Sequence, residues 1–168
     1  MYGLLETYMY HDSFEFSPTD NLREKCNAPN DCCGVYIVTA YFGDGKQEVV
    51  YIGSSGHIEG DELISRKGGL RRRIVGRQKD IESCKLTFRT ELWPKLMTRQ
   101  FISKLDISWY NTGEDNPLIV EYCLILEYII CHKRLPAWNN ELKLNGQLKG
   151  ELEKFITKNN IEILTVMF

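Results

Sequence analysis

The clearest pattern of apolar and polar positions is a pair of short apolar runs, residues 34–42 and 47–53, separated by a polar link. Both runs are rich in valine, isoleucine and tyrosine, which favour β-strands. The link, Gly43-Asp44-Gly45-Lys46, contains an Asp-Gly pair that tolerates the positive φ angles of a tight turn. The pattern therefore predicts a β-hairpin, in which Tyr36 and Tyr51 come from separate strands into one neighbourhood.

Further along the chain, residues 105–110 alternate between apolar and polar side chains and predict a third strand with one buried face. Near the start, Phe14 and Phe16 alternate with polar neighbours and indicate a short edge strand. The tail, residues 147–168, predicts a helix and a short strand over residues 161–166.

Helical spacing of apolar residues marks three further segments. Leu70, Ile74 and Ile81 form a stripe that predicts a helix over about residues 70–83, surrounded by arginines. Trp93-Pro94 is typical of a helix start with proline in the first turn. Asn116-Pro117 opens a strongly apolar segment that predicts a buried helix to about Lys133.

These elements predict an α/β (α+β) fold, with a small three-stranded antiparallel sheet flanked by helices. The 168 residues suit one domain. Residues 34–140 would form this domain, residues 1–33 an N-terminal extension, and residues 141–168 a C-terminal extension packed on the same domain.

Composition narrows the class of protein. No apolar stretch reaches the length of a membrane span, and the first residues lack the basic and hydrophobic regions of a secretory signal. We therefore expect a cytoplasmic protein with no membrane partner. The six cysteines include no Cys-x-x-Cys pair, and the histidines complete no zinc pattern.

Charge is distributed unevenly along the chain. The formal net charge of −2 argues by itself against a nucleic-acid-binding protein. However, residues 66–79 contain seven basic residues and no acidic one. A concentrated basic patch can bind phosphate on a nearly neutral protein, although a solvated helix face would have the same composition.

The order of these motifs resembles the GIY-YIG nuclease family. Gly34-Val35-Tyr36 and Tyr51-Ile52-Gly53 resemble the two tripeptides that name the family, and Leu70-Arg71-Arg72-Arg73-Ile74 resembles its arginine helix. A glutamate follows on the segment 117–133, and Asn139 follows Pro136. The resemblance covers residues 34–140 and most suits the compact, stand-alone bacterial or phage members.

The resemblance implies a metal-dependent DNA endonuclease. Tyr36 would take the proton of the attacking water, Tyr51 would orient the phosphate or the water, and Arg73 would clamp two phosphate oxygens with its planar guanidinium. Arg71 or Arg72 remains an alternative to Arg73 as the arginine that faces inward. Contacts with DNA are expected from Ser54, Ser55, Arg66, Lys67, Arg71, Arg72, Arg77 and Asn139.

The metal ligand has two candidates, Glu121 and Glu127, and the ion would be Mg²⁺ or Mn²⁺. They lie about 240° apart around a helix axis at 100° per residue, so both cannot face one site. We favour Glu121 because it lies nearer the helix start and better fits the surrounding apolar pattern.

The near-neutral net charge and the absence of the family's downstream histidine or tyrosine leave a second function open. Residues 57–69 are inserted before the arginine helix, and Arg77 stands where many members carry a histidine or tyrosine. Arginine stays protonated and cannot act as a base near neutral pH. The alternative is a non-catalytic nucleic-acid-binding module on the same scaffold.

Overall fold

The computed structural model describes residues 2–59, 62–64, 67–142, 148–159 and 161. Its main sheet is antiparallel, with four strands in the order β1-β8-β2-β3. In chain order the elements are η1 Gly3–Thr7, β1 His11–Phe16, α1 Leu22–Lys25, β2 Gly34–Phe42, β3 Gln47–Ser55, β4 His57–Glu59, β5 Glu62–Ile64, α2 Gly69–Ile74, β6 Arg77–Lys79, β7 Leu86–Phe88, α3 Arg89–Arg99, β8 Ile102–Asn111, α4 Pro117–His132 and α5 Lys149–Lys158.

The mixed α+β class is confirmed, but the sheet has four strands rather than three. The fourth strand is β1, the edge strand indicated by Phe14 and Phe16, and it pairs along its whole length with β8. Phe14 and Phe16 of β1 are buried in the core beneath α1 and α3, and this burial holds the strand in the sheet. Residues assigned to an N-terminal extension are thus part of the central sheet.

The hairpin predicted from the two apolar runs is present as β2 and β3. Gly45 at its tip has φ +87°, and Asp44 Oδ1 accepts a hydrogen bond of 3.0 Å from the Lys46 N–H. A register shift after Val38 leaves one extra residue on β3. Because β3 is the last strand of the sheet, its outer edge is available for a site.

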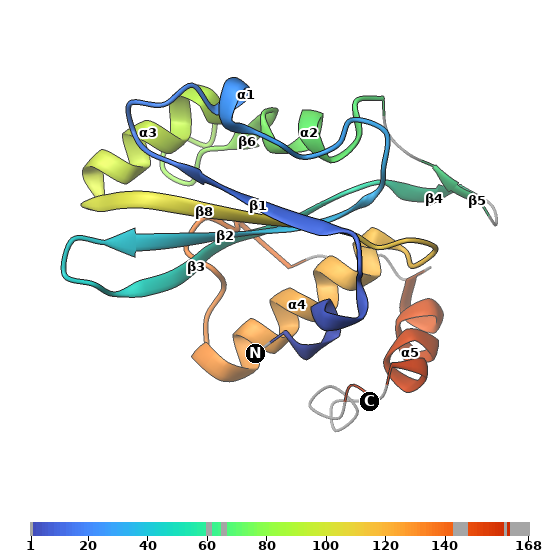
Figure 1. Ribbon diagram of the computed structural model, residues 1–168. Coiled ribbons are helices and arrows are strands. Elements are labelled where there is room, and N and C mark those ends of the chain that lie inside the picture. The colour runs from blue at the N-terminus through green and yellow to red at the C-terminus, as the bar shows by residue number, and fades with distance from the viewer. Residues whose placement is uncertain (1, 60–61, 65–66, 143–147, 160, 162–168) are drawn as a thin grey trace.

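Helices cover both faces of the sheet (Figure 1). On one face, α1, α2 and α3 pack over the side chains of Tyr36, Val38 and Tyr51. On the other face, η1, α4 and α5 pack over Val35 and Ile37. Each face has its own core, as the alternation of side chains along β2 requires.

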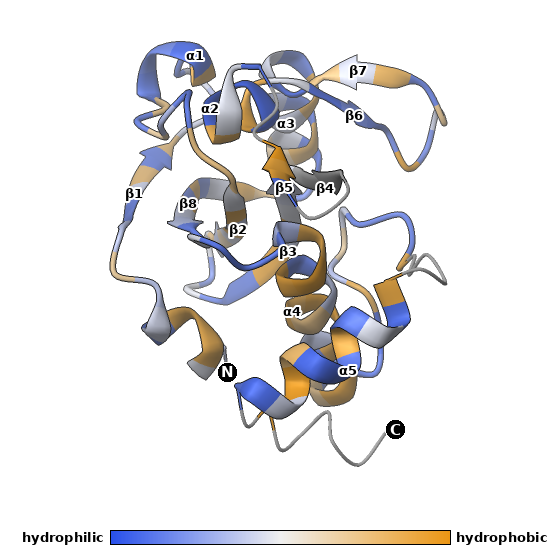
Figure 2. Ribbon diagram, turned by 90° about the vertical axis from the view of Figure 1, so that its right-hand side faces the viewer, coloured by the Kyte–Doolittle hydropathy of each residue, from blue (hydrophilic) through white to orange (hydrophobic). Residues whose placement is uncertain are grey.

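The buried helix predicted from Asn116-Pro117 is α4. The Asn116 side chain accepts a hydrogen bond of 3.1 Å from the Leu118 N–H, and Pro117 occupies the first turn, where no N–H is needed. The helix ends at Lys133, which adopts a left-handed conformation with φ 59°. Figure 2 shows the apolar colour of α4 between the sheet and α5.

The helix predicted over residues 70–83 is wrong beyond Ile74. The chain turns at Val75 and Gly76, and the strands β6 and β7 pair as a short hairpin. Ile81, expected on the apolar stripe, is exposed. The next helix, α3, begins at Arg89 rather than at Trp93.

Two other expectations are answered only in part. The predicted insertion over residues 57–69 contains the paired strands β4 and β5. The strand predicted over residues 161–166 lies outside the described residues, except for Ile161. Among the helices that the structure describes, none has both the length and the apolar character to cross a membrane.

Candidate active site at the edge of the sheet

Gly53 on the edge strand β3 makes room for two tyrosines. Gly53 pairs with Tyr36 of the neighbouring strand. A Cβ atom at Gly53 would lie 2.6 Å from Tyr36 Oη and 2.8 Å from Tyr51 Cε1. The Tyr36 side chain therefore lies across the edge strand, and the two ring centroids are 5.9 Å apart. The hairpin brings the tyrosines together as the sequence predicted.

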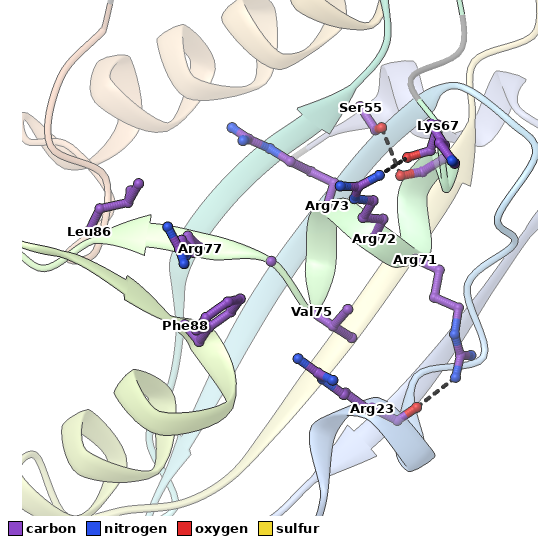
Figure 3. Close-up of a pocket in the computed structure, with 12 residues that line it drawn as sticks. Arg23, Ser55, Lys67, Arg71, Arg72, Arg73, Val75, Arg77, Leu86 and Phe88 are labelled. Atoms are coloured by element: carbon purple, nitrogen blue, oxygen red, sulfur yellow. Dashed lines mark hydrogen bonds between the residues drawn. The ribbon is translucent and has the colours of Figure 1, made fainter.

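The three adjacent arginines of α2 take three different paths. Arg71 donates hydrogen bonds to the backbone carbonyls of Cys26 and Arg23, and Arg72 is exposed and donates to the carbonyl of Lys67 at 3.3 Å. Figure 3 shows Arg73 leaving the helix in a direction different from that of Arg71. The charge of Arg73 interacts most strongly with Tyr36 and then with Tyr51 and Glu121. Arg73 is therefore the arginine that faces the tyrosines.

The two candidate glutamates of α4 lie in different environments. Glu121 accepts a hydrogen bond from the Ser54 hydroxyl of β3, and its charge interacts with Tyr36 and Arg73. Glu127 accepts a hydrogen bond of 2.7 Å from the backbone N–H of Tyr2. Glu121 is thus the glutamate that the structure brings to the tyrosines and the arginine, whereas Glu127 holds the N-terminal segment.

Two buried polar atoms at this site lack hydrogen bonds. Tyr36 Oη and Arg73 Nε have no hydrogen-bond partner among the described residues, although the two side chains are close enough for their charges to interact. Buried donors and acceptors in folded proteins are nearly always hydrogen-bonded. Such a pair beside a carboxylate is the arrangement expected where a polar ligand completes the site.

Burial and charge act in opposite directions on Tyr36. Burial raises the pKa of its phenol well above the ordinary value, while the positive charges of Arg89 and Arg73 lower it and Tyr51 and Glu121 raise it. The net shift is upward, so the hydroxyl is protonated at neutral pH. The pKa of Arg73 is raised too, chiefly by its interaction with Tyr36, so the guanidinium keeps its charge.

A cavity of about 920 Å³ adjoins the site and is lined by cations. Among the described residues that line it, none is acidic, and the charged ones are all basic, namely Arg23, Lys67, Arg71, Arg72, Arg73 and Arg77. Figure 3 shows that these residues come from α1, from α2 and the turn before it, and from β6. Among the described residues, the cavity thus gathers a concentrated positive charge on a chain whose net charge is −2.

The remaining predicted contacts have structural partners or lie elsewhere. The Ser55 hydroxyl donates to the Gly69 carbonyl at 2.9 Å and fixes the start of α2. The Asn139 amide exchanges two hydrogen bonds with the Ile52 backbone, of 2.9 and 3.0 Å, and so covers part of the outer edge of β3. Arg77 is exposed on β6 and stacks on Phe88 at 4.5 Å. Arg66 lies outside the described residues.

Arg89, which underlies both tyrosines of the site, was not singled out by any pattern in the sequence. It is fully buried beneath Tyr36 and Tyr51 and donates a hydrogen bond of 3.0 Å to Tyr51 Oη. In the sequence it stands between Phe88 and Thr90 like any surface arginine near a helix start. No spacing or periodicity distinguishes it, because its partners outside α3 are 11 to 53 residues away.

The side chains present fit a hard divalent ion held mainly by water. Within the described residues, no group of three histidine, cysteine, aspartate or glutamate side chains converges on one point. Mg²⁺ is commonly bound through one or two carboxylates, with water in its other positions. Glu121 supplies one carboxylate. The unbonded Tyr36 Oη and Arg73 Nε beside it could form hydrogen bonds with a phosphate or with water.

No protein-family model matches this chain, and searches of curated proteins and of solved structures returned no match. What the site can do is therefore inferred from its geometry and chemistry.

Proposed function

We propose that this protein is a metal-dependent DNA endonuclease that hydrolyses phosphodiester bonds at the edge of β3. The observation that carries the proposal is the pair of buried, unbonded polar atoms, Tyr36 Oη and Arg73 Nε, next to Glu121. A phosphate with its attacking water would satisfy both atoms. The motif order that resembles the GIY-YIG family supports the same chemistry, and DNA as the substrate suits the cytoplasmic location expected from the sequence.

The cationic cavity supports nucleic acid as the substrate. Lys67, Arg72 and Arg77 are exposed on its lining, where they can neutralise backbone phosphates. Arg73 extends from the same helix toward the tyrosines. A strand bound along the exposed cations would therefore have a phosphate within reach of Arg73.

Each residue has a distinct role in this proposal. The Arg73 guanidinium neutralises charge that develops on the phosphate oxygens. Tyr36 would first lose its own proton to solvent and would then, as the phenolate, receive the proton of the attacking water; Arg89 and Arg73 favour that phenolate against the effect of burial. Glu121 would hold the metal, and Ser54 orients that carboxylate. The ion, when bound, supplies Lewis acidity and a more acidic water.

The test is cleavage of supercoiled and linear plasmid with Mg²⁺ or Mn²⁺, comparing Arg73→Ala with Arg72→Ala and Glu121→Gln with Glu127→Gln. Loss of one charge-stabilising donor costs about 10²–10³ in rate, so we expect that loss for Arg73→Ala. Glu121→Gln should be inactive. Arg72→Ala should bind DNA more weakly but still cleave at saturation, and Glu127→Gln should cleave normally. Full activity of wild type in EDTA, or of Arg73→Ala, would refute the proposal.

A second candidate is a nucleic-acid-binding module without catalysis. It is favoured by one observation, namely that burial keeps the Tyr36 phenol protonated, which is unsuited to a base. This candidate predicts salt-sensitive DNA binding through the cationic cavity and no cleavage with any metal. Binding that Arg72→Ala weakens, together with an inactive wild type, would establish it.

A further inference from the structure

Arg89 joins three parts of the candidate site through its hydrogen bonds. It is the first residue of α3, and its side chain has 0% exposure. Its Nη2 donates to Tyr51 Oη at 3.0 Å, and its Nη1 donates to the backbone carbonyl of Arg73. Its Nε donates to Gln78 Oε1 at 2.9 Å. One guanidinium thus ties β3, α2 and β6 together.

The same guanidinium packs against aromatic rings. Its central carbon lies 5.0 Å from the ring centroid of Tyr51 and 5.6 Å from those of Tyr36 and Trp93. These distances are within the range of cation–π attraction. Because both tyrosine rings contact one planar cation, a change in its position would move both of them.

The charge of Arg89 has no carboxylate partner within the part of the chain that the structure describes. Among the ion pairs of the described residues, none includes Arg89, and its three hydrogen-bond acceptors are uncharged. Burial of a charge is costly unless an opposite charge compensates it, and arginine cannot become neutral by losing its proton. An anion that binds or forms at the adjacent site would supply that compensation.

We propose that Arg89 is a positioning residue for the tyrosines and Arg73, and that its buried charge favours a phosphate anion in front of them. The chemistry assigned to it rests on the proposed nuclease function. The Tyr51 hydroxyl and the Arg73 carbonyl are held directly, and the Tyr36 ring is held by packing. Arg89 does not touch the substrate, because the rings cover it.

The experiment compares Arg89→Met and Arg89→Lys with Arg99→Met, a control at an exposed arginine on the same helix. Three quantities are measured, namely the single-turnover cleavage rate at saturating DNA, the Kd for DNA, and the unfolding temperature. Residues that orient a catalytic group typically contribute about 10–100-fold to activity, so Arg89→Met should cleave 10–100-fold more slowly. Its Kd should change by less than about twofold, because exposed cations dominate affinity.

Stability separates positioning from a purely structural role. Arg89→Met takes a hydrogen-bond donor from three buried acceptors, so it should unfold somewhat earlier than wild type, and its cleavage rate is measured at a temperature where it is fully folded. Arg89→Lys keeps the charge and should recover part of the rate, while Arg99→Met should behave as wild type. A wild-type cleavage rate in Arg89→Met, or a rate loss explained wholly by unfolding, would overturn the proposal.

A readout that needs no cleavage distinguishes failure of the nuclease function from failure of the positioning role of Arg89. Protein labelled with ¹³C at tyrosine Cζ gives one NMR signal for each tyrosine, and Tyr36→Phe and Tyr51→Phe assign the two at the site. Arg89→Met should shift both signals and leave that of Tyr8 unchanged, whereas Arg99→Met should shift neither. If the wild type is inactive but these shifts appear, the nuclease function fails and positioning stands. Unmoved signals overturn positioning.

Discussion

The two faces of the central sheet are packed by different means. On the face covered by α4 and α5, the core is formed by apolar side chains such as Ile37, Ile119 and Leu124. On the face covered by α2 and α3, Trp93 and Tyr36 pack around the buried guanidinium of Arg89. Both faces bury hydrocarbon, and the face covered by α2 and α3 encloses a charge in addition.

This difference bears on which face carries the proposed site. Hydrophobic burial is not directional and needs no particular partner, so the α4 face tolerates many apolar sequences. A buried polar network is costly unless each member is satisfied, so its residues are tightly specified. The network around Arg89 leaves Tyr36 Oη and Arg73 Nε unbonded at the sheet edge. We interpret these two unbonded atoms as groups that lower the stability of the free protein and that a bound ligand would satisfy.

The largest effect on stability is expected at the centre of the apolar face. Leu124 is fully buried, and Leu124→Ala removes apolar contacts and leaves a cavity. We expect the free energy of unfolding to fall by about 2–5 kcal/mol, as measured by denaturant titration. Cleavage per folded molecule should be unchanged at low temperature. A selective loss of cleavage in the folded variant would contradict the division between the two faces.

A smaller loss of stability, with a complete loss of cleavage, is expected for Gly53→Ala. The added methyl group would lie 2.6 Å from Tyr36 Oη and 2.7 Å from Tyr36 Cζ, so the ring must move. Overpacking of this kind costs about 1–3 kcal/mol. Gly43→Ala is the matched control, because a Cβ at Gly43 meets no atom within 4 Å. Normal cleavage by Gly53→Ala would show that the position of Tyr36 is unimportant.

The same contrast explains which elements the sequence predicted. The β2–β3 hairpin and α4 were predicted because side-chain periodicity and local caps determine them. The helix over residues 70–83 was wrong because the end of α2 depends on a distant residue. The Arg73 carbonyl, which a longer helix would bond to the N–H of Arg77, accepts hydrogen bonds from Gly76 and Arg89 instead.

The candidate site was predictable where a motif names its residues. Tyr36, Tyr51, Arg73 and Glu121 were singled out from the sequence, and the structure places them together. Arg89 was missed because its role depends on tertiary contacts with residues of four other segments. Buried polar residues such as Arg89, whose partners are distant in the sequence, therefore hold the α2 and α3 face together without leaving a local sequence pattern.

Two buried tyrosines, one on each face of the sheet, allow the two faces to be compared through the loss of a single hydroxyl. Tyr8 packs in the α4 core and donates a hydrogen bond of 3.1 Å to Asp115 Oδ2, so Tyr8→Phe should lower the free energy of unfolding by about 1 kcal/mol. Tyr36→Phe removes a hydroxyl that has no partner among the described residues, so stability should stay the same or rise. Cleavage should be lost only in Tyr36→Phe. Equal destabilisation of both would mean that Tyr36 Oη is satisfied.

The smallest effect on stability is expected at Glu48, near the start of β3, a charged residue that forms ion pairs with Lys46 and Arg134. Burial acts to raise the pKa of this carboxyl, but Lys46 at 2.8 Å and Arg134 at 2.5 Å lower it overall. A lowered pKa in the folded state contributes stability above the unfolded pKa, near 4.5, and that contribution is lost as the pH falls through the folded value. Glu48→Gln should therefore be slightly less stable than wild type at pH 7, and the difference should vanish in acid.

The measurement is the free energy of unfolding of both proteins between pH 7 and pH 3. The effect should be smaller than that of Tyr8→Phe, because ion pairs near the surface contribute little. Arg134 is half exposed beside a carboxylate, whereas Arg89 is fully buried and pairs with no carboxylate of the described residues. If Glu48→Gln cost more than Tyr8→Phe, charge pairing would support the α4 face as well. The contrast between a hydrocarbon face and a charged face would then no longer hold.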